Sequence, residues 1–321
     1  MKGTVDMRIG FGKLKYVSFV LLQSVVYGFG NPLTKIAYES ITPFWLLTFR
    51  FTIALMIFLI FFGRSIISQL KSVKPSQFLP ASFCMAVAYI TCNLALKWTS
   101  ATNVGFLMSL PVIFAPVLVV PILKRKYNFK YLPLQLIVVL GLYLLCSNGG
   151  RFQFNIGDLF ALTTAIAISG ALAFGEKSLE SMDAFAISAS QAGITAAVSF
   201  VCALLFDDFS VIPRVAPEAW MVISYLALAC TCAAYVLQNS ALAHLSSGTV
   251  SMLQCTQPIL TALCSFILLG ETLSFIGLLG AFIILGALLV LNLMEQKGSR
   301  QEKPEPGTNV LINESSEQEG I

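Results

Sequence analysis

The stretch PFWLLTFRFTIALMIFLIFF, residues 43–62, carries one charged side chain, Arg50, among residues that are almost all apolar. A bilayer core is about 30 Å thick, and a helix of roughly 20 apolar residues crosses it. Backbone amides in lipid must pair within their own segment, so we interpret this stretch as a transmembrane helix. Nine similar stretches fill most of the remaining chain. The expected spans are 16–37, 43–62, 78–98, 101–122, 130–147, 157–176, 184–205, 219–239, 247–269 and 273–292.

The composition of the 321-residue chain agrees with this interpretation. Hydrophobic residues make up 57% of the sequence and charged residues 11%, which excludes a water-soluble globule of this length. A transmembrane β-barrel would show alternating segments of about ten residues, and none appears. The loops between spans are too short for a soluble catalytic domain. We therefore expect an all-α polytopic membrane protein with ten transmembrane helices.

The second half of the chain repeats the first. The stretch YITCNLALKWTSATNVGFLMSLP, residues 89–111, aligns with YVLQNSALAHLSSGTVSMLQCTQP, residues 235–258, and a weaker match sets Arg50 opposite Gln191. Five spans per repeat is an odd number, so the halves would enter the membrane from opposite faces. Such an inverted repeat places a substrate site near the midplane and permits alternating access. The expected domains are the N-terminus 1–15, the five-helix repeats 16–147 and 157–293, and a disordered tail 294–321.

Basic residues are concentrated in alternate loops, and this distribution predicts the orientation of the chain in the membrane. Clusters within 2–15, 64–74, 124–130 and 297–303 fall on one side of the membrane. Fewer basic residues fall on the other side, namely Lys35, Lys97, Arg151 and Arg214. The positive-inside rule puts both termini in the cytoplasm. We expect a multi-pass protein of the plasma membrane with a cytoplasmic tail.

The repeated segments resemble a known family. The stretches ALKWTSATNVGFLMSLPV (95–112) and ALAHLSSGTVSMLQCTQPILTALCSFILLGETLS (241–274) are similar to the EamA-like members of the drug/metabolite transporter superfamily, whose L-G-E-x-L motif stands at 269–273. The arginine of the second span matches Arg50. The first half has Leu-Lys-Arg-Lys at 123–126 in place of the motif. The resemblance covers 16–293 and implies carrier-type transport, often export of metabolites or amino acids, without naming the substrate.

Polar side chains inside lipid are costly and tend to face the bundle interior, which selects the candidate site residues. Arg50 could hold a carboxylate in a bidentate pair. It could instead snorkel to the outer interface or clamp helix ends, which we slightly favour because the family implied by the resemblance keeps this arginine across many substrate types. Asn31, beside the kink at Pro32, could bind substrate or a neighbouring helix.

Two tyrosine–asparagine pairs repeat between the halves. Tyr89 and Asn93 lie one turn apart on the third span, and Tyr235 and Asn239 do so on the eighth. They could line opposite walls of a cavity or hydrogen-bond between helices. The further candidates, all close to the proline positions Pro111 and Pro258 in the fourth and ninth spans, are Asn103, Gln254 and Gln257.

The types and positions of the polar residues disfavour an enzyme and an ATP-driven pump. All sixteen acidic residues lie at span ends, in loops or in the termini, and none is expected at the middle of the membrane. Neither a Ser/His arrangement, an HExxH motif nor a GxxxxGK[ST] motif is present. Glu176 could reach a cavity only if the sixth span extends beyond that residue. All eight cysteines fall inside spans, which indicates free thiols rather than disulfides. We expect no cofactor and no metal.

We therefore expect a secondary transporter, an exporter of neutral, zwitterionic or anionic metabolites with amino acids as the leading class. Its alternatives are an integral-membrane enzyme and a multidrug cation carrier. The expected partners are a small-molecule substrate and the lipid bilayer, with no nucleic acid. A homodimer is compatible with the sequence.

Overall fold

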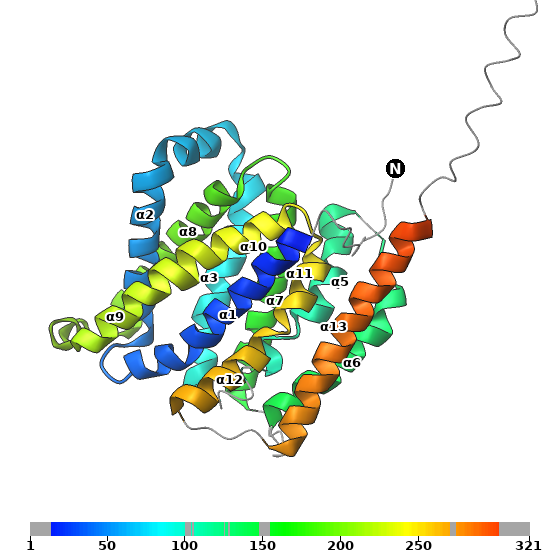
Figure 1. The fold of residues 1–321 in the computed structure, drawn as a ribbon. Coiled ribbons are helices and arrows are strands. Elements are labelled where there is room, and N and C mark those ends of the chain that lie inside the picture. The colour runs from blue at the N-terminus through cyan, green and yellow to red at the C-terminus, as the bar shows by residue number, and fades with distance from the viewer. Residues whose placement is uncertain are drawn as a thin grey trace, which may run out of the picture.

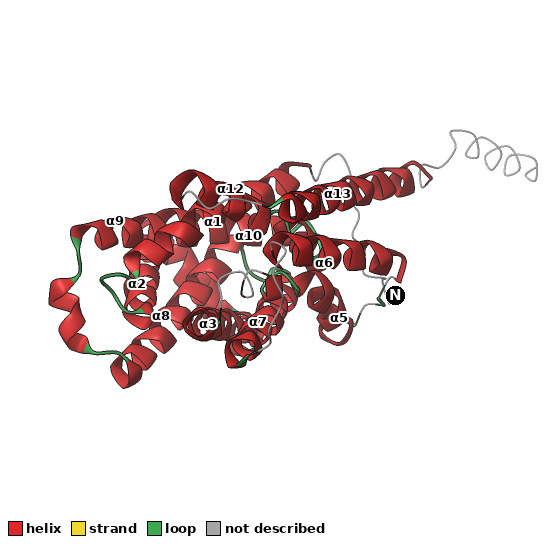
Figure 2. Cartoon of the chain, turned by 90° about the horizontal axis from the view of Figure 1, so that it is seen from below, coloured by secondary structure: helices red, strands yellow, loops and turns green. Residues whose placement is uncertain are grey.

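The computed structural model describes residues 14–99, 104, 106–124, 126–127, 129–147, 155–269 and 274–301. These residues form helices joined by short loops, with no extended strand in the described ranges (Figures 1 and 2). The first half contains α1 (Leu14–Ala37), α2 (Pro43–Ser72), α3 (Pro75–Trp98), α5 (Pro111–Leu123), η2 (Phe129–Tyr131) and α6 (Leu132–Ser147). The second half contains α7 (Ile156–Ser178), α8 (Ala184–Phe206), η3 (Phe209–Arg214), α9 (Pro217–Tyr225), η4 (Leu226–Ala233), α10 (Ala234–Leu242), α11 (Ser247–Gln254), α12 (Gln257–Leu269) and α13 (Phe275–Gln301).

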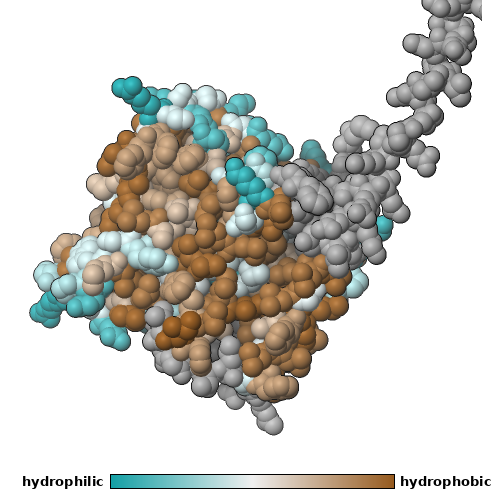
Figure 3. Space-filling view, viewed as in Figure 1, coloured by the Kyte–Doolittle hydropathy of each residue, from teal (hydrophilic) through white to brown (hydrophobic). Residues whose placement is uncertain are grey.

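Membrane-spanning length is reached by 5 helices of the described chain, judged by length and composition. They are Pro43–Ser72, Pro75–Ala95, Ile156–Ser178, Ala184–Phe206 and Pro217–Leu242. The outer surface is apolar over much of the face in Figure 3, with hydrophilic residues gathered toward its edges. Large side chains such as Ile60, Phe206 and Phe275 are at least 73% exposed. Such a surface is stable against lipid, whereas in water it would drive aggregation. The protein is a multi-pass helical membrane protein.

Helices from opposite halves of the chain pack on one another. The largest contacts join α3 to α7, α2 to α8, α6 to α13, α1 to α12, α3 to α8, and α5 to α7. The backbones of α6 and α13 touch, because a Cβ atom at Gly280 would lie 2.5 Å from the carbonyl oxygen of Gly141. Without a hydrophobic effect between helices in lipid, small residues of this kind permit the close packing that holds helices together.

Two expected spans are interrupted. The fourth has a turn at 108–110, after which Pro111 begins α5, and the ninth breaks at Cys255 and Thr256 before α12 begins at Gln257 with Pro258 next. Proline lacks a backbone N–H and fits the first turn of a helix, so each proline begins a new segment. Pro32 lies within α1, which continues past it to Ala37.

Two boundaries and one internal turn differ from the sequence prediction. The second span was expected to end at residue 62, but α2 continues to Ser72, where Ile66 is buried and anchors the extra turns. The eighth span contains the π-helical turn η4 between α9 and α10. The expectation of disorder from residue 294 is wrong for 294–301, because α13 runs to Gln301. Glu, Gln, Lys and Arg there propagate a helix that has already formed. The rest of the tail lies outside the described residues.

Candidate functional site

A buried arginine organises the polar interior of the bundle. Arg50 on α2 is 6% exposed. Its Nε atom donates to Thr231 Oγ1 at 2.8 Å, and its Nη2 atom is 3.4 Å from the hydroxyl of Tyr89 and 3.5 Å from the carbonyl oxygen of Cys230. These partners are a hydroxyl, a phenol and a carbonyl. Within the described chain, no carboxylate is among them.

The π-helical turn η4 supplies two of these partners. Its wider hydrogen-bond register differs from that of the flanking helices, and π-turns are frequent at functional sites. Thr231 donates to the carbonyl of Leu226, five residues before it, at 3.0 Å and accepts from Arg50 on its other side. The turn therefore orients both the Thr231 hydroxyl and the Cys230 carbonyl toward α2.

Aromatic rings enclose the guanidinium. Its Cζ atom lies 5.1 Å from the ring centroids of both Phe51 and Tyr89, within the range of cation–π attraction. The hydroxyl of Tyr27 on α1 is 3.4 Å from that of Tyr89. The Tyr89 ring is 6.4 Å from that of Tyr235 on α10. We call Arg50, Tyr27, Phe51, Tyr89, Tyr235 and Thr231 the arginine cluster.

Asn93 adjoins this cluster, one turn along α3 from Tyr89. Its Oδ1 atom accepts from the hydroxyl of Tyr38, and its Nδ2 atom donates to the carbonyl of Tyr89 at 2.7 Å. The amide thus ties the turn after α1 to α3. The structure brings the first tyrosine–asparagine pair together with Arg50.

The second pair divides between two environments. Tyr235 joins the arginine cluster, but Asn239 faces α8, where its Nδ2 atom donates to Ser188 Oγ at 2.9 Å and to Gln191 Oε1 at 3.0 Å. Asn239 is fully buried. Hydrogen bonding between helices was the alternative that the sequence left open to a position of Asn239 on a cavity wall. A substrate role for Asn239 stays a prediction.

Gln254 lies in a second polar group of the interior. Its Nε2 atom donates to Gln238 Oε1 at 3.0 Å, and Gln23 Nε2 donates to the same oxygen at 2.7 Å. Sequence comparison missed Gln238 because its counterpart in the first repeat is Cys92. It missed Thr231 for the same reason, since no polar residue in the first half corresponds to it. Their location inside an apolar span was the available signal.

The other candidates are less informative. Gln257 is half-buried in the first turn of α12. Asn103 lies outside the described residues, as does the side chain of Asn31. The motif glutamate Glu271 is likewise outside them.

Glu176 has a structural partner. The sixth span does extend, because α7 ends at Ser178. However, the Glu176 carboxylate accepts from the backbone N–H of Ser247, the first residue of α11, at 2.7 Å. A carboxylate is favourable at a helix N-terminus. Glu176 therefore stabilises the start of the broken ninth span.

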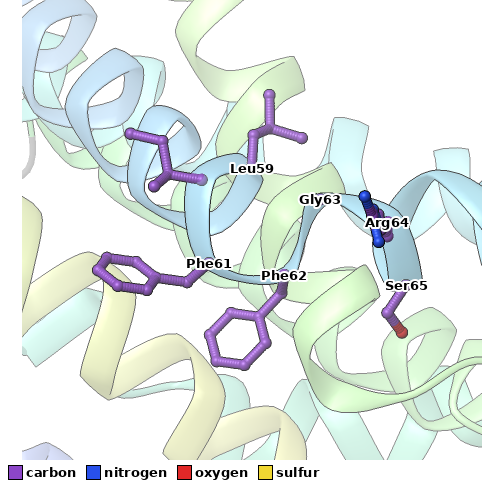
Figure 4. A pocket seen from close by; sticks show the side chains of 7 residues that line it. Leu59, Phe61, Phe62, Gly63, Arg64 and Ser65 are labelled. Atoms are coloured by element: carbon purple, nitrogen blue, oxygen red, sulfur yellow. The ribbon is translucent and has the colours of Figure 1, made fainter.

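A hollow of 360 Å³ lies elsewhere, along residues 59–65 of α2 (Figure 4). Its lining includes Phe61, which is 74% exposed, and Phe62, which is 43% exposed. Consecutive residues of a single helix form it, and none belongs to the arginine cluster. We assign it to the lipid-facing surface rather than to the site.

Comparisons with known proteins agree with this architecture. An uncharacterized transporter of Archaeoglobus fulgidus is 26% identical over 280 residues, covering 85% of this chain and 84% of its own. The riboflavin transporter ImpX of Fusobacterium nucleatum is 23% identical, covering 87% of this chain and 98% of its own. A solved crystal structure with 18% identity shares the fold, with a TM-score of 0.72 over 89% of this chain and 99% of that one. The model of the EamA-like transporter family matches residues 14–147 and 155–293. The chain belongs to the EamA-like transporter family and is a membrane transporter.

Proposed function

We propose that this protein is a secondary transporter that exports small metabolites carrying an anionic group, with amino acids as the leading class. The observation that carries the proposal is Arg50, a buried cation whose described partners are all neutral. A buried charge is strongly disfavoured without a counter-charge. A substrate carboxylate would supply the missing charge and can bind a guanidinium in a bidentate geometry.

Alternating access between two inverted five-helix repeats is the mechanism that fits the packing. The helix contacts have counterparts in which the two halves exchange roles. The contact of α1 with α12 corresponds to that of α7 with α5, and the contact of α3 with α7 corresponds to that of α10 with α1. The family model also matches each half separately. The interrupted fourth and ninth spans are related in the same way. Discontinuous helices at corresponding positions of two repeats are a feature of transporter binding sites.

The proposed orientation puts both termini in the cytoplasm of a plasma-membrane protein. The start of α1 and the end of α13 lie toward the same end of the molecule in Figure 1, which supports this. Cysteines introduced at positions 71 and 151 test it with an impermeant thiol reagent on intact cells, in a background without other reactive thiols. We expect labelling at 151 only. Labelling at 71 would reverse the topology.

Transport itself is tested by counterflow in proteoliposomes. We expect vesicles loaded with an L-amino acid to accumulate the labelled amino acid, and the matching decarboxylated amine to be ignored. Accumulation of the amine in preference to the amino acid would favour the multidrug cation carrier. Net chemical conversion of the substrate would favour the membrane enzyme. The arginine cluster offers no catalytic acid–base pair for such a reaction.

Flat heteroaromatic molecules form a second candidate class. The rings of Tyr27, Tyr89 and Tyr235 meet beside Arg50, and aromatic faces suit the stacking of a planar ligand. One relative is named a riboflavin transporter. Riboflavin belongs in the counterflow panel for this reason. Its transport without that of amino acids would replace the leading class with this one.

A further inference from the structure

Three glutamine side chains from three helices meet inside the bundle. Gln23 on α1 and Gln254 on α11 both donate to the Oε1 atom of Gln238 on α10, at 2.7 and 3.0 Å. Gln23 is 1% exposed, Gln238 is 5% exposed and Gln254 is half-buried. We call these residues the glutamine triad.

The triad leaves hydrogen-bonding capacity unused. The Oε1 atom of Gln23 is buried and accepts no hydrogen bond from any described residue. A buried polar atom without a partner is destabilising by about 1–3 kcal/mol. A 180° rotation of a side-chain amide exchanges its oxygen and nitrogen. Rotating all three amides keeps both hydrogen bonds of the triad with donor and acceptor exchanged. The Gln23 nitrogen is then unpaired in place of the Gln23 oxygen. In either arrangement Gln23 presents an unpaired amide atom.

The triad adjoins the arginine cluster. Gln23 precedes Tyr27 by four residues on α1, about 6 Å along the helix axis. Gln238 follows Tyr235 by three residues on α10. Tyr27 contacts Tyr89, which contacts Arg50. The two groups of polar side chains therefore follow one another along the same two helices, one turn apart.

We propose that the glutamine triad binds the distal end of the transported substrate, and that this end is a neutral planar group such as a carboxamide, a ureido group or an imide. These groups carry a donor and an acceptor side by side, which matches side-chain amides that can present either. A second carboxylate could only accept, and an aliphatic end would leave the Gln23 amide unpaired. The inference rests on the proposed function, in which Arg50 holds the carboxylate.

The competing explanation is that the triad only holds α1, α10 and α11 together. Hydrogen bonds between polar side chains do join helices in membranes. That explanation predicts no preference between substrates that differ only at their distal end. Sites built to bond a polar group, by contrast, discriminate strongly against analogues that lack it.

The test compares L-glutamine with L-homoleucine, in which two methyl groups replace the amide oxygen and nitrogen. Initial counterflow rates are measured in proteoliposomes and normalised to folded protein. For the native protein we expect L-glutamine to exceed L-homoleucine by about tenfold or more. Gln238→Leu should remove that preference, because the rate for L-glutamine falls by more than the rate for L-homoleucine. Gln23→Met, which preserves side-chain length, should act in the same direction if Gln238→Leu fails to fold.

Gln135→Met is the matched control. Gln135 is a fully buried glutamine on α6 that accepts from Tyr127 at 2.6 Å, away from the triad. Its substitution should lower the folded yield without changing the preference. An unchanged preference in both triad variants would overturn the proposal.

A thermal-shift assay with the same two amino acids separates this proposal from the proposed function. Transport of both amino acids at equal rates by the native protein would overturn the triad proposal and leave the proposed function standing. Absence of transport, with stabilisation by L-glutamine that Gln238→Leu removes, would overturn amino acid transport and retain the binding site. Neither transport nor stabilisation would overturn both.

Discussion

Arg50 and Gln191 lie opposite each other in the sequence repeat, yet their surroundings differ. Arg50 is a permanent charge whose described contacts are neutral groups on α3 and η4. Gln191 is a neutral amide that accepts from Asn239, the residue corresponding to Asn93. Asn93 instead bonds to Tyr38, in the turn that follows α1. Equivalent positions have thus become a charged centre in one half and a neutral hydrogen-bonded contact in the other.

The difference indicates a division of labour between the halves. A neutral amide pair carries no charge that needs a counter-charge, so it suits a fixed contact between α8 and α10. Asn239 Oδ1 and Gln191 Nε2 are nevertheless buried without a hydrogen-bond partner among the described residues. A buried guanidinium needs a counter-charge, and the described protein does not contribute one. In the proposed function, Arg50 of the first half therefore holds the substrate charge, while the corresponding contact of the second half, Asn239 with Gln191, holds α8 against α10. Four predictions test this contrast.

The largest expected effect is the loss of Arg50. Arg50→Gln gives the first half the side chain of the second and removes a charge-assisted pair of about 1.5–3 kcal/mol, or roughly ten- to a hundredfold in carboxylate transport. Arg50→Lys should retain part of the rate, because it keeps the charge without the bidentate geometry. Counterflow normalised to folded protein measures this. Full transport by Arg50→Gln would exclude Arg50 from substrate binding.

The two asparagines should respond differently. Asn93→Leu removes the link between α3 and the turn after α1, one helical turn from Tyr89 of the arginine cluster, so transport per folded molecule should fall several-fold. Asn239→Leu leaves Ser188 and Gln191 without their partner, which destabilises by about 1–3 kcal/mol. It should therefore lower folded yield and total transport in parallel. Size-exclusion yield and counterflow, measured on one preparation, separate the effects. Similar profiles for both variants would remove the proposed division of labour.

Two tyrosine hydroxyls provide a smaller contrast. Tyr27→Phe removes the contact with Tyr89, and we expect a loss of about 1 kcal/mol in stability and a measurable loss of transport. The hydroxyl of Tyr235 is buried and has no hydrogen-bond partner among the described residues. Tyr235→Phe should therefore leave the melting temperature unchanged or raise it. A strong loss of transport in Tyr235→Phe alone would show that this hydroxyl contacts the substrate.

The smallest effect concerns pH and lies outside the membrane. The pKa of Asp208, in the loop after α8, is lowered by hydrogen bonds from the backbone N–H and hydroxyl of Ser210. Its lowered pKa means that the carboxylate stabilises the fold above its unfolded pKa, and that this contribution is lost as pH falls through the folded pKa. The melting temperature of the native protein should therefore fall slightly as the pH is lowered. Asp208→Asn should reduce this fall without changing transport. A large change in transport would connect this loop to the site.

Much of the architecture was predictable from residue order. Apolar runs such as 184–205 predicted helices within a residue or two of their ends, and the positions of Pro111 and Pro258 marked two later interruptions. The repeat also singled out the two tyrosine–asparagine pairs, Tyr89 with Asn93 and Tyr235 with Asn239. It could not show that Gln238, Thr231 and Gln23 are polar partners of the interior, because polar residues without a counterpart in the other half escape a comparison of repeats.

Local sequence determined the helices because backbone groups in lipid must pair within their own segment, so apolar length alone indicates a span. It also determined the family, through motifs that lie close together in the chain. The tertiary structure determined which polar side chains meet. Asn239 turned toward α8, Glu176 capped α11, and the π-turn placed the Cys230 carbonyl against Arg50. These outcomes depend on helix rotation and close packing between segments far apart in sequence, which periodicity within one segment does not specify.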